Sequence, residues 1–284
     1  DGTTVMDFDP EEKKRKVSVS ASVYALEING RKLNLADAPG LFDFAGGVTE
    51  ALSAADSALI VISGKSGLTS GAKQSFLKAR SVGKAAAFFI GKLDSTHAHF
   101  YRVISALVGN YGALICPVTV PYIENDEVKC YINLIENKAY SCDGFETKEM
   151  RMPVSNETEE MRNMLLEAVA TADDALMEKY FAGEEFTPDE IISGLKKGVA
   201  SGDICPVFCG IQQTGAAVPM TVDILLETMP TCADSAYLLA DRSEHKFDEN
   251  GEKALFVFKT IADPFVGKLS YFRVVSGEIT NDTR

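Results

Sequence analysis

Two short motifs in the sequence combine acidic, basic and glycine residues in a pattern that suits nucleotide chemistry. Asp37-Ala38-Pro39-Gly40 follows the strand-like run Leu33–Ala36, and Gly91-Lys92-Leu93-Asp94 follows the apolar run Ala85–Ile90. An Asp at the end of a strand can hold Mg²⁺ while a Gly amide contacts a phosphate, and a Lys stem can cover a purine base whose N–H groups donate to an Asp carboxylate. Either motif alone fits an ordinary turn. Together they favour a nucleotide site.

The elements that must position these motifs are alternating strands and helices. A hairpin over Val17–Leu35 is predicted around Asn29-Gly30, a dipeptide that supplies the positive φ angles of a tight turn. Three apolar strands then alternate with three helices; they are Leu33–Ala36, Ser57–Ser63 and Ala85–Ile90, with helices around Gly47–Ala55, Ser70–Val82 and Thr96–Leu107. Near-continuous apolar strands between helices predict a parallel sheet that is covered on both faces.

The middle of the chain has a different pattern, β-rich first and helical afterwards. The predicted strands are Leu114–Pro121, Val128–Ile135 and Ala139–Ser141. A long helix is expected from Asn156, capped by its own side chain with Glu159, to about Phe181. Thr187-Pro188-Asp189-Glu190 predicts another capped helix that ends near Val199. This segment should form a subdomain beside the main sheet.

The last third returns to the α/β pattern and then begins a β-rich part. The expected elements are a strand at Cys205–Gly210, a helix at Pro219–Met229, and strands at Ala254–Ile261 and Leu269–Val275. These patterns give the domain limits 1–112, 113–199, 200–232 and 233–284.

The composition excludes several classes of protein. Hydrophobic residues make up 46% of the 284 residues and charged residues 24%, as in a folded globular protein. The net charge of −13 argues against a non-specific grip on nucleic acid, and no sequence-specific nucleic-acid partner is expected. No apolar run approaches the ~20 residues of a membrane span. The six cysteines form no Cys-x-x-Cys pair, which disfavours zinc and disulfides and favours the cytoplasm.

Longer stretches carry a resemblance to a known family. MDFDPEEKKRKVSVS (6–20), DAPGLFDF (37–44) and Gly91–Asp94 resemble the switch I, switch II and guanine-recognition regions of elongation factor G, closest to a divergent branch of that family. DDALMEKYFAGEE (173–185), PVFCG (206–210) and IADPFVGKLSYFRVVSG (261–277) are similar to its insert helix, the strand before its last guanine loop and the opening of its β-barrel domain. The resemblance covers essentially the whole chain.

The resemblance implies a partial P-loop GTPase-type domain, of α/β class, with an inserted α+β subdomain and the start of a β-barrel domain. It also implies GTP or GDP with Mg²⁺ as cofactors and the ribosome as partner. A strand and phosphate loop are expected before Asp1, so this chain should bind nucleotide weakly and be inactive as a GTPase. Ser18 and Asp37 would hold the metal. The other nucleotide-binding positions would be Gly40, Gly91, Lys92, Asp94, Gly210 and Ile211.

Three positions depart from the family pattern. Leu41 replaces the His that positions the attacking water, and its hydrocarbon side chain makes no hydrogen bond. Gly91 replaces the Asn of the guanine motif, and Ile211 stands in the final guanine loop. One alternative is therefore a ribosome-associated binding protein that has lost GTP hydrolysis. A ribosomal-protection factor, which shares the N-terminal half of the family, is another.

Overall fold

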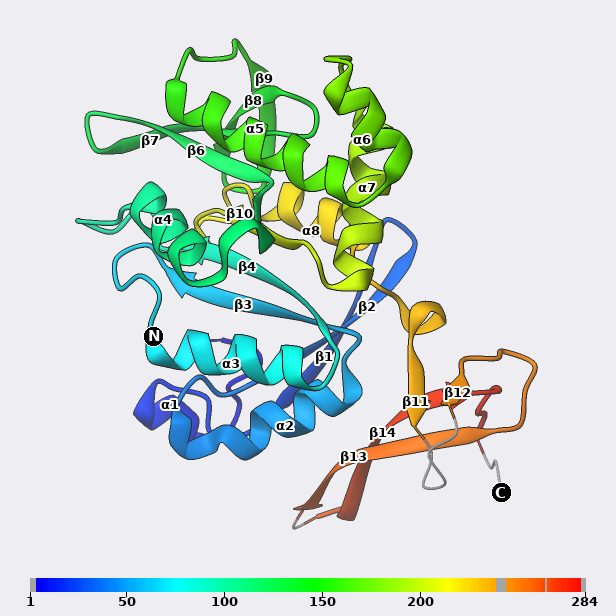
Figure 1. Cartoon of the computed structure of the whole chain (residues 1–284). Helices are drawn as coiled ribbons and strands as arrows, with labels where there is room; N and C mark the ends of the chain where they lie inside the picture. Colours follow the sequence, from blue (N-terminus) through cyan, green and yellow to red (C-terminus); the bar gives the residue numbers. More distant parts are fainter. Residues whose placement is uncertain (1–3, 239–243, 264, 282–284) are drawn as a thin grey trace. The chain divides into compact units, whose positions relative to one another are not determined.

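The computed structural model describes residues 4–238, 244–263 and 265–281, which divide into two compact units (Figure 1). We call Ser57–Pro230 the sheet unit, and Asp1–Asp56 with Thr231–Arg284 the terminal unit. Each unit is described by itself.

The sheet unit is built around a four-stranded parallel sheet with the strand order β3-β4-β10-β5. Its strands are β3 (Ser57–Ser63), β4 (Ala85–Gly91), β5 (Ile115–Pro117) and β10 (Cys205–Cys209). All of β4 is buried, because strands flank both of its edges and helices α3 and α7 contact it. The parallel sheet predicted from the apolar runs is confirmed for β3, β4 and β10.

Helices cover this sheet. They are α3 (Ser70–Ser81), α4 (Phe100–Tyr111), α7 (Pro188–Ser201) and α8 (Val218–Thr228). The ring of Phe76 in α3 lies 5.1 Å from that of Phe88 in β4 and 4.6 Å from that of Tyr111 in α4, so α3 and α4 share one face of the sheet. The predicted capping box of α7 is confirmed, since Thr187 accepts from the Glu190 amide and Glu190 accepts from the Thr187 amide.

A second, antiparallel sheet follows in the order β6-β7-β8-β9. Its strands are β6 (Thr119–Glu124), β7 (Glu127–Asn133), β8 (Lys138–Asp143) and β9 (Glu146–Met150). The run Leu114–Pro121, expected to lie in one subdomain, is divided: after a 3₁₀ turn at Gly112–Leu114, β5 joins the parallel sheet and β6 the antiparallel sheet. Between them, the Val118 amide donates to Val207 O at 2.9 Å, and Val118 O accepts from the Leu134 amide at 3.0 Å. Val118 therefore belongs to the hydrogen bonding of both sheets.

The long helix expected over 156–181 is wrong, because two helices occupy this stretch. They are α5 (Asn156–Thr171) and α6 (Asp174–Phe181). Asp173 lies between them and caps the second, where its carboxylate accepts from the Ala175 amide at 2.9 Å. The cap of α5 is Ser155 rather than Asn156, and its hydroxyl accepts from the Thr158 amide at 3.3 Å. A capping side chain inside a helical pattern thus divides it.

The terminal unit begins with α1 (Pro10–Arg15) and the predicted hairpin. Strands β1 (Ser22–Ile28) and β2 (Arg31–Asp37) meet at Asn29 and Gly30, whose φ angles are 51° and 70°. The expectation that Leu33–Ala36 joins the parallel sheet is wrong, since β2 pairs with β1 in a two-stranded antiparallel sheet. The two-residue turn fixes the antiparallel pairing of β2 with β1. A 3₁₀ turn (Phe42–Phe44) and α2 (Ala45–Ala54) complete the segment.

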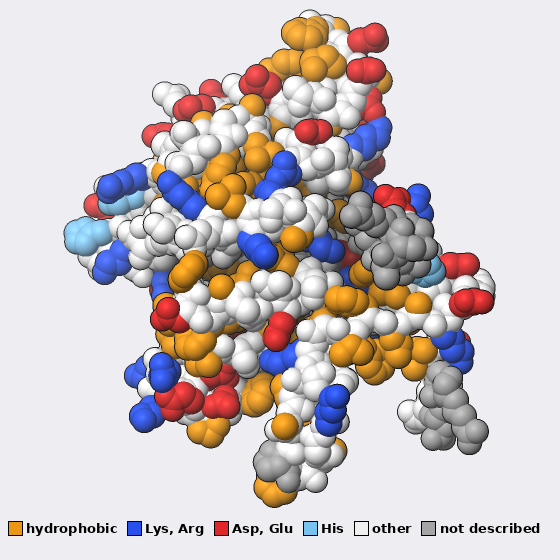
Figure 2. All heavy atoms as spheres, turned by 60° about the horizontal axis from the view of Figure 1, so that its bottom comes forward, with side chains coloured by type: hydrophobic (Ala, Val, Ile, Leu, Met, Phe, Trp, Pro, Cys, Tyr) orange, Lys and Arg blue, Asp and Glu red, His pale blue; other side chains and the backbone are white. Residues whose placement is uncertain are grey.

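The C-terminal part of this unit is a set of short β-pairs. After a 3₁₀ turn at Cys232–Asp234, β11 (Ala236–Leu238) pairs with β12 (Glu244–Lys246), and β13 (Ala254–Asp263) pairs with β14 (Gly267–Ser276). The two strands predicted here are confirmed. Leu255, Val257 and Phe272 leave much of their hydrocarbon exposed, and Figure 2 shows hydrophobic side chains gathered along this ribbon. Within the described ranges, no helix is long and apolar enough to cross a membrane.

Candidate functional site

The residues predicted to bind nucleotide fall in both units. Ser18, Asp37, Gly40 and Leu41 belong to the terminal unit, and Gly91, Lys92, Asp94, Gly210 and Ile211 belong to the sheet unit. The two groups are therefore described separately.

In the terminal unit, a buried carboxylate fixes the loop that carries Ser18. Glu12 is 1% exposed, and its Oε1 accepts from the amides of Val19 at 2.9 Å and Ser20 at 3.2 Å. Its Oε2 accepts from the Asp9 amide, which closes the capping box of α1. Backbone N–H groups thus provide hydrogen bonds to the Glu12 carboxylate, which is buried away from water. These bonds hold α1 and the segment after it together.

Ser18 and Asp37 lie in an acidic environment. The Ser18 hydroxyl donates to Asp7 Oδ1 at 2.8 Å, and the Thr4 hydroxyl donates to Asp7 Oδ2 at 2.7 Å. Removal from water raises the pKa of Asp37, and the negative charges of Asp7 and Glu12 raise it further. Three carboxylates therefore interact around the end of β2, where a cation would relieve their repulsion.

Gly40 and Leu41 form an open turn before α2. Gly40 has free space where a side chain would project, and Pro39 before it is buried against Gly47. Leu41 is 48% exposed and the next residue, Phe42, is 74% exposed. The turn therefore presents hydrocarbon, and its side chains cannot orient a water molecule by hydrogen bonding.

In the sheet unit, the two predicted guanine loops follow neighbouring strands. Gly91 ends β4, Gly210 follows β10, and the Gly210 amide donates to Ile90 O at 3.2 Å. The Ile211 amide donates to Ala216 O at 3.0 Å and closes the second loop on itself. Because β4 and β10 are parallel and adjacent, both loops lie at the carboxyl edge of the sheet, where ligands commonly bind in α/β proteins.

One residue joins these loops that sequence reasoning did not select. The Lys92 amide donates to Gln212 Oε1 at 3.0 Å, although the two residues are 120 positions apart. Lys92 adopts a φ of 55°, which turns the chain sharply after Gly91. The only sequence signal was the polar pair Gln212-Gln213 after the buried strand, and it does not reveal which side chain reaches back.

Asp94 is exposed, and its charge acts on a buried tyrosine. The Tyr131 hydroxyl, on a residue that is 3% exposed, has no hydrogen-bond partner among the residues that the structure describes. Burial raises the pKa of Tyr131, and nearby Cys209, Cys142 and Asp94 raise it further. The Tyr131 phenol therefore remains neutral, while the Asp94 carboxylate is exposed to solvent.

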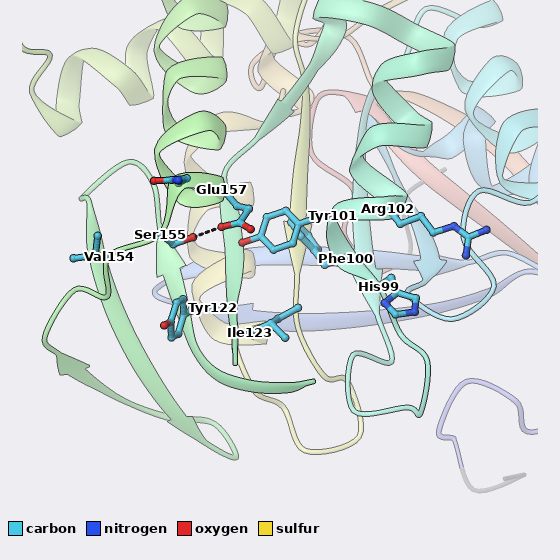
Figure 3. Close-up of a pocket in the computed structure, with 10 residues that line it drawn as sticks. His99, Phe100, Tyr101, Arg102, Tyr122, Ile123, Val154, Ser155 and Glu157 are labelled. Atoms are coloured by element: carbon cyan, nitrogen blue, oxygen red, sulfur yellow. Dashed lines mark hydrogen bonds between the residues drawn. The ribbon is translucent and has the colours of Figure 1, made fainter. Parts of the chain in front are cut away.

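A separate hollow of about 750 Å³ lies between the starts of α4 and α5 (Figure 3). It is lined by His99, Phe100, Tyr101, Arg102, Tyr122, Ile123, Val154, Ser155, Asn156 and Glu157. Tyr101 donates to Pro121 O at 3.0 Å, and burial raises its pKa to about 12. The Ser155 hydroxyl donates to Glu157 at 2.8 Å. Arg102 points away from these groups in Figure 3, so the polar groups shown there do not converge on a ligand position.

Comparisons with known proteins find related sequences and a related structure. Residues 1–231 match the family model described as the elongation factor Tu GTP binding domain. Elongation factor G from two strains of Ureaplasma parvum serovar 3 is 30% identical over 293 aligned residues, which cover 100% of this chain and 43% of each relative. A crystal structure of a protein from Thermus thermophilus matches 97% of this chain and 40% of its own with a TM-score of 0.84 and 28% identity. The chain thus spans less than half the length of these relatives.

Proposed function

Because this chain belongs to the family of the elongation factor Tu GTP-binding domain, we propose that it is the guanine-nucleotide-binding part of an elongation-factor-G-like translation factor. Its nucleotide would be GTP or GDP, and its partner would be the ribosome in the cytoplasm. The relatives named elongation factor G support this assignment along the whole length of the chain.

One observation carries the proposal: the Lys92–Gln212 hydrogen bond joins the loops after β4 and β10. These loops would form the base subsite. Lys92 would lay its aliphatic stem over the purine, and the exposed Asp94 carboxylate would accept from the ring N–H and the exocyclic amino group. The loop after β4 presents both an exposed base, Lys92, and an exposed acid, Asp94.

The acidic group in the terminal unit supports a magnesium site at Ser18 and Asp37. The Ser18 hydroxyl donates a hydrogen bond to Asp7, so the lone pairs of its oxygen remain available to a cation. The interacting carboxylates of Asp37, Asp7 and Glu12 favour a cation at this position, which would also be held by phosphate and water. Mg²⁺ would supply charge neutralisation for the phosphates there.

A titration with GDP and ADP tests the nucleotide proposal. The ¹⁵N-labelled chain is titrated in the presence of Mg²⁺, and the backbone shifts of 91–94 and 210–214 are followed. We expect GDP to shift these signals at lower concentration than ADP does. Equal response to the two nucleotides, or a response confined to other segments, would overturn the proposal.

A second candidate function is nucleotide-dependent ribosome binding without hydrolysis. The observation that favours it is the exposed hydrocarbon at Leu41 and Phe42, at the turn where the family positions its attacking water. Single-turnover hydrolysis on ribosomes separates the two candidates, since a nucleotide-loaded protein that never releases phosphate supports the second.

A further inference from the structure

The side chain of Gln212 fills the space beside Gly91. A Cβ atom placed on Gly91 would lie 2.5 Å from Gln212 Oε1 and 3.2 Å from its Cδ. Any larger residue at position 91 would therefore displace the Gln212 carboxamide. Glycine at the end of β4 thus leaves the room that the glutamine after β10 fills, with the Phe89 ring also 3.2 Å from that Cβ position.

Lys92 fixes the orientation of this carboxamide. Its backbone N–H donates at 3.0 Å, and only the oxygen of an amide can accept such a bond. The Gln212 amino group consequently faces away from Lys92 with two N–H donors. Since Gln212 is exposed, these donors are accessible to a ligand.

The backbone donors of the two residues before Gln212 are already used. The Gly210 amide donates to Ile90 O, and the Ile211 amide donates to Ala216 O. The two positions that the sequence placed in this loop therefore have no free N–H to offer a base. The donors at the start of the loop come from Gln212.

We propose that Gln212 is a specificity-determining residue, whose amino group recognises the O6/N7 edge of guanine. Both atoms on this edge are acceptors, whereas adenine presents an amino donor in place of O6. Asp94 would hold the opposite, donor-rich side of the base. The bond to Lys92 fixes the carboxamide before the nucleotide arrives, which reduces the entropy lost on binding. This inference rests on the proposed nucleotide function.

Gln212→Glu is the sharpest test, because it keeps an oxygen for the Lys92 amide and removes both donors. Gln213→Glu is the matched control, since it makes the same change at the adjacent exposed position. We expect Gln212→Glu to weaken GDP binding in the NMR titration by roughly 10-fold, the equivalent of one hydrogen bond and an added repulsion, and to spare ADP. Hydrogen exchange of the Lys92 amide should stay unchanged.

The outcomes separate the role of Gln212 from the proposed nucleotide function. If the unchanged chain prefers GDP and the two Glu variants bind it equally, the role of Gln212 is overturned while the nucleotide function stands. If the unchanged chain shows no preference for GDP, both fail. A selective loss in Gln212→Glu, with Lys92 still protected, supports the inference.

Discussion

Arg273 and Asp56 lie 217 positions apart in the sequence, and an ion pair of 2.7 Å joins Nη2 to Oδ1. Arg273 also donates to Ala54 O at 2.6 Å, and the Ser235 hydroxyl donates to Asp56 at 2.5 Å. Both side chains of the pair are mostly buried, so β14 is fastened to the end of α2 within the terminal unit.

Asp56→Ala should therefore loosen β14. Its removal leaves the Arg273 charge without its partner, which costs about 2 kcal/mol. Hydrogen exchange of the β14 amides measures the local opening free energy. Glu11→Ala is the control, because the exposed Glu11–Arg15 pair within α1 contributes only about 0.3 to 0.5 kcal/mol. Equal protection of β14 in both variants would contradict this role of the ion pair.

Gly91→Ala should change selectivity more than stability. The new methyl group meets the flexible end of Gln212, which can move aside, so the cost should stay below about 1 kcal/mol. The preference for GDP over ADP should fall. In a Gln212→Ala background the same substitution should have no further effect on that preference.

Gly210→Ala is the contrasting control for this substitution. Its Cβ would lie 2.6 Å from the backbone oxygen of Ala216, which cannot move alone. Its cost should reach about 1 to 3 kcal/mol, measured by urea unfolding. Similar losses of stability from alanine at positions 91 and 210 would show that the Gln212 side chain does not move aside for the new methyl group.

Tyr131→Phe should leave the stability of the sheet unit unchanged or raise it by up to about 1 kcal/mol, since it removes a buried hydroxyl for which the described part of the chain offers no hydrogen-bond partner. Tyr101→Phe should destabilise it by about 1 kcal/mol, because the Tyr101 hydroxyl donates to Pro121 O. Urea-dependent hydrogen exchange of β7 compares the two. The same loss in both variants would mean that the Tyr131 hydroxyl has a partner in solution.

Leu41→His should raise GTP hydrolysis on ribosomes in a longer form of the protein that also carries the phosphate loop of the family. An imidazole can hold the attacking water, whereas leucine cannot, so we expect at least ~10-fold faster single turnover, about 1.4 kcal/mol of barrier. Saturating GTP separates this rate from any binding defect. An unchanged rate with confirmed binding would remove Leu41 from this role.

Acid should weaken the start of α6. The hydrogen bond from Lys197 lowers the pKa of Asp173 below its usual 3.8, and the Ala175 amide lowers it further. The unfolded chain then binds more protons than the folded chain, so this contribution is present above pH 3.8 and is lost as the pH falls through the lower folded value. Asp173→Ala should reduce α6 protection at neutral pH and differ less from the unchanged chain in acid. A pH-independent difference would contradict the charge effect.

Much of this fold could be predicted from short sequence signals, because those signals act locally. The Asn29-Gly30 turn and the capping box at Thr187 depend on residues next to each other, and the apolar run in β4 reports its own burial. The helix break at Asp173 was missed because a capping side chain and an ordinary surface Asp look the same in sequence. Strand β9 was missed because all of its residues are exposed, so it has no apolar face to detect.

The candidate site was less predictable for a different reason. The positions Gly91, Lys92 and Asp94 could be selected from their place after a buried strand. Gln212 could not, because its contact with Lys92 depends on β10 lying beside β4, a pairing across more than a hundred residues. The separation of Ser18 and Asp37 into another compact unit was equally invisible in the sequence.

The position of β10 also determines when the parallel sheet can close while the chain is being synthesised. It occupies an inner place in the parallel sheet, between β4 and β5, yet it is the last of the four strands to be made. At about 5 to 20 residues per second, Cys205 follows Gly91 by roughly 6 to 23 seconds. Through that interval the edges of β4 and β5 that later bind β10 stay open, so a nascent chain displays two apolar strand edges to any chaperone or neighbouring chain. Closure of the sheet and assembly of the Lys92–Gln212 contact then occur in one late step.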